Sequence, residues 1–134
     1  MQKAIIFLII VLASNFVGMY FGFDNFWWFD VSLHFLGGFF VAMLMVHYLT
    51  DIKGLRITDY ELRPLKKYLI IIGAVSFIGV IWEFAEYDAT QTLTELLYDN
   101  FGFRIYFIGD LNDTIKDLFM DILGAFAWLI INDK

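Results

Sequence analysis

Cysteine is absent from this sequence of 134 residues, and with it several kinds of site. Without a thiol the chain forms no disulfide and offers no thiolate ligand for zinc, an iron–sulfur cluster or covalently attached haem. A phosphate-binding loop, a zinc-protease motif, a nucleophile elbow and a dinucleotide fingerprint are also missing. No short motif in the sequence therefore names a reaction.

Apolar residues are abundant instead. Hydrophobic residues make up 60% of the chain and aromatic residues 20%, and the mean hydropathy is +0.70. Soluble domains are about 45–50% apolar, so this composition places the chain among integral membrane proteins. A membrane-spanning helix needs about 20 apolar residues. Residues 1–134 therefore predict a single domain of four spans, with no room for a separate soluble domain.

Four apolar segments form the predicted spans, at residues 4–23, 30–49, 67–87 and 114–131. A segment within the hydrocarbon core must satisfy its own backbone hydrogen bonds, so each is expected to be helical. The first segment follows Lys3 and could instead be a cleaved signal peptide, but it stays apolar well past any cleavage-site pattern. We therefore expect an all-α, four-helix transmembrane bundle.

A short helix is expected before the last span. Leu93, Leu96, Leu97 and Phe101 recur at helical spacing within residues 92–101. Such an amphipathic segment is typical of a helix that lies in the membrane interface.

The basic residues predict the orientation. In a four-span chain both termini and the 50–66 loop share one side, which holds seven of the nine basic residues: Lys3, Lys53, Arg56, Arg63, Lys66, Lys67 and Lys134. The positive-inside rule places that side in the cytoplasm. We therefore expect an inner-membrane protein with both termini cytoplasmic.

Most acidic residues fall on the opposite side. Eleven of the 15 lie outside or in the outer halves of the spans: Asp24, Asp30, Glu83, Glu86, Asp88, Glu95, Asp99, Asp110, Asp113, Asp117 and Asp121. Several share a helix face, because residues three or four apart lie one above the other. The expected stripes are Asp30 with His34, then Gly79 with Glu83 and Glu86, then Asp110, Asp113, Asp117, Asp121 and Gly124. Together they predict an outward-facing intramembrane cluster, with glycines that allow the helices to approach closely.

Charge balance suggests what this cluster holds. A carboxylate at mid-membrane costs about 2.5 to 3.5 kcal/mol on insertion scales, so such residues are usually paired or functional. The nearby cations are too few to neutralise seven carboxylates. Either several acids are protonated, or a divalent ion such as Mg²⁺, Ca²⁺, Mn²⁺ or Zn²⁺ is bound. The candidate ligands are Asp30, His34, Glu83, Asp113, Asp117 and Asp121, and the candidate general bases are Glu86 and Asp110.

Simpler roles are open for some of these residues. Asp110 and Asp113 could cap the amino terminus of the last helix, where the helix dipole favours acids. That explanation fails for Asp117 and Asp121, which lie one and two turns deeper. His34 could be hydrogen-bonded to a neighbouring carboxylate without holding any ligand.

The order of these motifs resembles a known family. Asp30-x3-His34-Phe35-x-Gly37-Gly38, then Trp82-Glu83-x2-Glu86, then Gly109-Asp110-x2-Asp113-Thr114-x2-Asp117 is similar to the YjdF-like inner-membrane proteins, and more distantly to the VanZ-like family. The match covers roughly residues 24–131. The resemblance implies that Asp30, His34, Glu83, Asp110, Asp113 and Asp117 form the site. It names no reaction, but the association of VanZ-like proteins with glycopeptide resistance implies a role in the cell envelope.

Three classes of function fit these observations. The first is a metal-dependent membrane enzyme, such as a hydrolase, acting on a lipid or lipid-linked envelope substrate. The second is a proton or cation translocator that uses the acids as a relay. The third is a non-catalytic protein in which a cation or protonated acids hold the helices together. The lipid bilayer is the expected partner, nucleic acid is not, and the oligomeric state is left open.

Overall fold

Four helices make up the part of the chain that the structure describes. The computed structural model describes residues 1–23, 26–51, 64–102 and 106–132. The helices are α1 (Gln2–Phe21), α2 (Trp27–Asp51), α3 (Pro64–Phe101) and α4 (Leu111–Asn132). No strand occurs among the described residues, so the prediction of an all-α fold is confirmed.

Two of the helices end at a glycine in the left-handed conformation. Gly22 follows α1 with φ of 73°, and its N–H donates to the carbonyls of Gly18 and Met19. Gly102 follows α3 with φ of 76°, and its N–H donates to the carbonyl of Tyr98 at 2.9 Å. Residues with a Cβ rarely adopt this conformation, which makes glycine the usual residue just beyond a helix end.

Three helices are long and apolar enough to cross a membrane: α1, residues 27–49 of α2, and residues 65–101, which lie in α3. α4 has 22 residues, which matches the length of a span. It is not among these candidate spans, because its first half carries the charged residues Asp113, Lys116, Asp117 and Asp121. Its carboxyl-terminal half is as apolar as the other helices.

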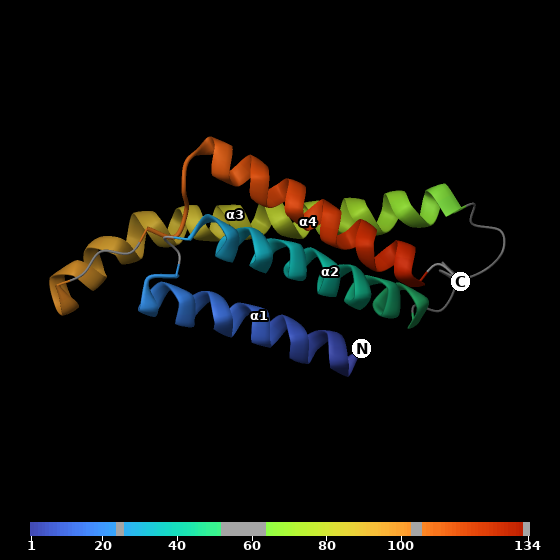
Figure 1. Cartoon of the computed structure of the whole chain (residues 1–134), viewed down its shortest axis with the longest axis horizontal. Coiled ribbons are helices and arrows are strands. Elements are labelled where there is room, and N and C mark those ends of the chain that lie inside the picture. The colour runs from blue at the N-terminus through green and yellow to red at the C-terminus, as the bar shows by residue number, and fades with distance from the viewer. Residues whose placement is uncertain (24–25, 52–63, 103–105, 133–134) are drawn as a thin grey trace.

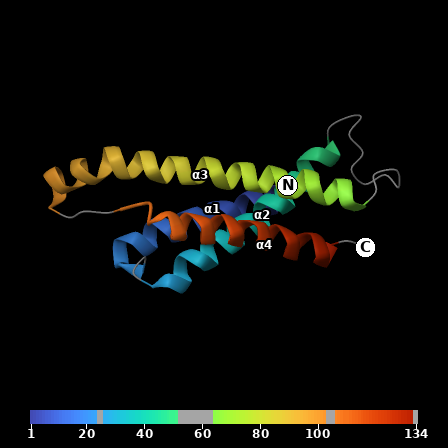
Figure 2. The same ribbon diagram turned by 90° about the horizontal axis from the view of Figure 1, so that it is seen from above.

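The helices run alternately up and down, so that α2 and α4 are parallel and the two ends of the chain lie at one end of the bundle (Figure 1). α4 makes its most extensive contacts with α2 and also packs on α3, whereas α1 packs on α2 alone within the described chain. A quarter turn of the view shows α4 running alongside α3 (Figure 2). The pair α2–α4 is therefore the centre of the fold.

The surface of the bundle is strongly apolar, and its interior contains several acids in addition to apolar side chains. Large apolar side chains are exposed along the helices, among them Ile9, Phe16, Phe77 and Ile130. The buried side chains instead include one histidine and four carboxylic acids. Soluble proteins rarely expose such large apolar areas, so this surface suits contact with lipid.

The apolar core lies toward the end of the bundle that carries the termini. It contains Ala42 of α2, Ile71 and Val75 of α3, and Ala125, Trp128 and Leu129 of α4. The buried acids lie toward the other end. One half of the bundle is thus packed with apolar side chains, and the other half is polar inside.

The expected separate interfacial helix is not separate. Residues 92–101 are helical, but they continue α3, which runs unbroken for 38 residues. Neither glycine nor proline occurs between Gly79 and Gly102, so nothing in the sequence ends the helix sooner. At 1.5 Å per residue α3 is about 57 Å long, nearly twice a hydrocarbon core of about 30 Å. Its last turns project beyond the other helices (Figure 1).

Thr90 of α3 forms hydrogen bonds with the segment that leads into α4. Its hydroxyl oxygen accepts the backbone N–H groups of Phe107 at 2.9 Å and Ile108 at 3.1 Å. We expect Thr90→Val to leave both amides without this acceptor and to speed their hydrogen exchange, with little loss of overall stability. Thr92→Val is the matched control, because the Thr92 hydroxyl only donates to its own helix at Asp88. Equal exchange at Phe107 in both variants would contradict this role of Thr90.

Candidate functional site

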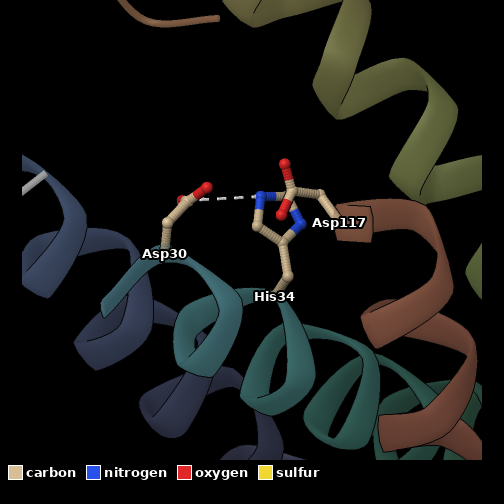
Figure 3. Close-up of side chains that lie close together, drawn as sticks. All are labelled: Asp30, His34 and Asp117. Atoms are coloured by element: carbon tan, nitrogen blue, oxygen red, sulfur yellow. Dashed lines mark ion pairs between the residues drawn. The ribbon is translucent and has the colours of Figure 1, made fainter. Parts of the chain in front are cut away.

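His34 is the centre of the buried cluster. It lies on α2 one turn after Asp30, and its Nε2 is 3.8 Å from the Asp30 Oδ1. Figure 3 shows both side chains rising from α2, with the Asp117 carboxylate reaching them from α4. The imidazole is buried, whereas Asp30 is about one-third exposed. Asp30 therefore lies where the cluster meets its surroundings.

α4 supplies two further carboxylates, one turn apart. Asp117 and Asp121 are both buried. The Asp121 Oδ1 is 3.6 Å from His34 Nδ1, so each nitrogen of the ring faces a carboxylate. Both distances are too long for a good hydrogen bond. The imidazole is thus held between two acids without being tightly bonded to either.

Glycines bring these helices together. A Cβ on Gly38 of α2 would collide with the backbone of Asp121, and one on Gly124 of α4 would collide with the backbone carbonyl of Phe35. On α3, a Cβ on Gly79 would meet the Asp121 carboxylate. Small residues of this kind let membrane helices approach closely. The glycines therefore set the depth and register at which His34 meets the acids of α4.

α3 completes the cluster with Glu83 and Glu86, which are both buried. Trp82 Nε1–H donates to Glu86 Oε1 at 2.8 Å, across one helical turn. This hydrogen bond fixes one oxygen of Glu86 and leaves the other available to the cluster.

Two buried oxygens are without partners. Glu83 Oε1 and Asp117 Oδ1 have no hydrogen-bond partner among the described residues. The exposed fractions of these residues are only 5% and 3%. Buried carboxylate oxygens are normally bonded, because an unbonded one has lost water and gained nothing. An unmet oxygen in such a place points to a bound ion, proton or water.

The ligand atoms converge in two groups of three, and both include His34. In the first, Asp30, His34 and Asp117 each offer an atom within 4.8 Å of the others; in the second, His34, Glu83 and Glu86 do so. Ca²⁺–oxygen distances of about 2.3 to 2.6 Å place opposite ligands about 4.6 to 5.2 Å apart. The spacing in each group thus allows a divalent ion to be held there.

Asp110 and Asp113 stand apart from these groups. Asp110 Oδ1 accepts the backbone N–H of Asp113 at 3.0 Å, so Asp110 caps α4. Asp113 Oδ1 accepts a 2.7 Å hydrogen bond from Lys116 Nζ, in a pair that is exposed to a large extent. Of the eight residues predicted for the site, the structure gathers Asp30, His34, Glu83, Glu86, Asp117 and Asp121, and leaves these two at the rim.

Comparison with protein families agrees with the membrane character of the fold. The model of a family described as "Predicted membrane protein (DUF2238)" matches residues 1–133. The chain belongs to this family. No curated protein and no solved structure matches the chain.

Membership of the DUF2238 family supports a membrane location and specifies no activity. The match covers the first predicted span as well as residues 24–131, the stretch on which a relation to YjdF-like and VanZ-like proteins is expected. The match does not itself point to either of those two families. Their kinship with this DUF2238 protein therefore remains a proposal.

Sequence reasoning missed two parts of the site in this DUF2238 protein. One is Trp82, whose hydrogen bond to Glu86 was signalled only by their spacing of four. The other is a cavity beside His34 and Asp121, which no sequence pattern predicts.

Gly18 of α1 fits against the ring of Phe29, so it serves packing between α1 and α2.

Proposed function

We propose that this protein is a four-helix transmembrane enzyme whose buried acids and histidine hold a divalent metal ion. The ion serves a hydrolytic reaction on a lipid or lipid-linked envelope substrate at the outer side of the inner membrane. The resemblance to YjdF-like and VanZ-like proteins is consistent with this setting. The observation that carries the proposal is the pair of unpartnered buried oxygens on Glu83 and Asp117, which belong to the two candidate ligand groups that share His34.

The orientation is part of the proposal. α4 runs beside α2 along much of its length, so it crosses the bilayer if α2 does. Both ends of the chain lie at one end of the bundle, as four crossings require (Figure 1). Lys3, Lys66 and Lys67 lie at that end, and the further basic residues Lys53, Arg56 and Arg63 lie outside the described residues. The positive-inside rule then puts the acid cluster on the outer side.

A metal ion suits this cluster because its positive charge would offset part of the negative charge of the buried carboxylates. Five buried or half-buried carboxylates surround His34, the one histidine among them. A divalent ion held by Asp30, His34 and Asp117 would offset two of those charges and give the Asp117 oxygen a partner. Bound there, the ion would polarise a phosphate or ester oxygen, or lower the pKa of a water molecule.

Glu86 is the best-placed general base. It is buried within the cluster, close to His34 and Glu83, and Trp82 Nε1–H donates to its Oε1. A base must be fixed within reach of the proton that it takes. Asp110 is less suited to this role, because its side chain already caps α4.

A translocator is less well supported. A relay needs a polar path through the whole bundle. Between the cluster and the end of the bundle that carries the termini, the interior is filled by apolar side chains such as Ala42, Val75, Ala125 and Trp128. The buried core residues of this half include no titratable group.

A structural role for the same acids has one observation in its favour. His34 lies between Asp30 and Asp121, and this arrangement could hold α2 and α4 together without any metal. Such a role leaves Glu83 Oε1 and Asp117 Oδ1 unexplained unless those acids are protonated.

Elemental analysis of the detergent-purified protein tests the proposal. We expect about one or two equivalents of a divalent metal in the wild type, in keeping with the two ligand groups, and a marked loss in Asp117→Asn. Asp88→Asn is the matched control, since Asp88 is an exposed acid outside both groups. It should keep the metal.

No metal in folded wild-type protein, even after soaking with Mg²⁺, Ca²⁺, Mn²⁺ and Zn²⁺, would refute the metal site and favour the structural role. Metal that is lost equally from Asp117→Asn and Asp88→Asn would show nonspecific binding to surface acids.

A further inference from the structure

A cavity of about 250 Å³ lies directly beside the acid cluster. Its walls come from α1, α2 and α3 together with Asp121 of α4, and they are apolar apart from Asn15, His34 and Asp121. At one end the lining includes His34 and Asp121, which belong to the cluster. Protein interiors rarely leave an unfilled space much larger than a water molecule, whose share of liquid volume is about 30 Å³. The cavity is therefore large enough to receive part of a ligand.

We place the mouth of the cavity at its side, between α1 and α3. These two helices make no backbone contact in the described chain, so only side chains close the gap between them. Leu12 of α1 and Ile78 of α3 line the cavity and are also 40% and 37% exposed. Both residues lie in the middle of their apolar helices. In a membrane the mouth of the cavity therefore faces lipid chains, not water.

The two ends of the cavity differ in chemistry. Leu8, Val11, Val41 and Val75 line a region that suits a hydrocarbon chain, whereas His34 and Asp121 lie where a polar group would sit. A water-soluble molecule would meet apolar walls and an entrance within the hydrocarbon layer. A bilayer lipid matches both ends and is present at the mouth at high concentration.

We infer that this cavity admits part of one acyl chain of a bilayer phospholipid, which enters between α1 and α3. The chain's ester-linked end then lies toward His34 and Asp121. The placement of that polar end at the reacting site rests on the proposed function, whereas entry of the chain does not. The substrate class is thus a phospholipid that arrives from within the membrane.

Photolabelling tests this inference. The full chain is reconstituted in vesicles of phosphatidylethanolamine and phosphatidylglycerol with a trace of phosphatidylglycerol that carries a diazirine on one acyl chain. After illumination, mass spectrometry locates the labelled residues. We expect label on Val75, which is almost fully buried but lines the cavity, as well as on Phe77, which faces lipid on the same helix. Label on Phe77 without label on Val75 would overturn the inference.

A cavity-filling variant provides the second arm. Val11→Trp should abolish the label on Val75 and leave that on Phe77, whereas Ile10→Trp, at an exposed position beside it, should change neither. Val41→Phe serves the same purpose from α2. Label on Val75 that persists in both filling variants would show that the chain reaches it by another route and overturn the inference.

Two further readings separate the possible failures. Added polyprenyl phosphate that removes the Val75 label would assign the cavity to a prenyl chain and overturn the acyl-chain assignment. Metal content measured on the same samples reports on the proposed function alone. Label on Val75 in a metal-free protein would uphold the lipid cavity and refute the metal site.

Discussion

His34→Ala is expected to remove all specifically bound divalent metal from this protein. His34 belongs to both groups of candidate ligands, and no other residue does. Loss of an outer hydrogen-bond partner of a metal ligand typically weakens binding about 10- to 100-fold, so loss of a shared ligand should exceed that range. Equilibrium dialysis of the purified variant against the metal found in the wild type measures the effect.

Single substitutions within each group make the matched comparison. Asp30→Asn should weaken only the group that contains Asp117, and Glu86→Gln only the group that contains Glu83. Thermal unfolding supplies a second readout, because a ligand that binds the folded state raises stability by about 2.7 kcal/mol at 100 times its dissociation constant. Added metal should raise the unfolding temperature of the wild type but not of His34→Ala. A folded His34→Ala protein that retains the full metal content would place the metal elsewhere.

Gly124→Ala should be severely destabilising although it adds a single methyl group. The new Cβ would collide with the Phe35 carbonyl at the closest approach of α2 and α4. Neither backbone can move without moving its whole helix. We therefore expect the overpacking to lower the free energy of unfolding by about 1 to 3 kcal/mol or more. The same movement would pull Asp117 and Asp121 away from His34. The unfolding temperature in detergent and the metal content should therefore fall together.

Gly73→Ala is the matched control. A Cβ at Gly73 meets nothing within 4 Å, and this glycine lies on an exposed part of α3. Alanine is favoured over glycine in a helix by about 1 kcal/mol, so this variant should be neutral or slightly more stable. Equal unfolding temperatures for the two variants would show that the α2–α4 contact is looser than the structure has it.

The sequence predicted, for each helix separately, which candidate site residues share a face. The spacing of four between Asp30 and His34, and between Asp117 and Asp121, follows from the helical period, and it identified the faces correctly. The same period could not separate Asp110 and Asp113 from Asp117, because all of them lie on one stripe. Only the position at which α4 begins, at Leu111, makes Asp110 a cap and leaves Asp117 buried.

The sequence likewise predicted the number of helices but not where each of them ends. Apolar length predicted four helices, because a chain in lipid has to satisfy its backbone hydrogen bonds within each segment. Composition does not predict the continuity of α3 through residues 88–101, because the change to polar residues there suggests a break. Composition changes at the membrane surface, but a helix ends only where the backbone is interrupted, here at Gly102.

The sequence by itself determined that this is an all-α membrane protein with acids gathered in one half of its helices, because composition and the helical period are properties of the chain alone. Tertiary structure alone decided which of those acids meet. That outcome depends on the register between α2 and α4, which is set where Gly38 meets Asp121 and Gly124 meets Phe35. Contacts between segments so distant along the chain leave no periodic signal in either one. The cavity is likewise formed by all four helices together, because its lining residues come from α1, α2, α3 and α4.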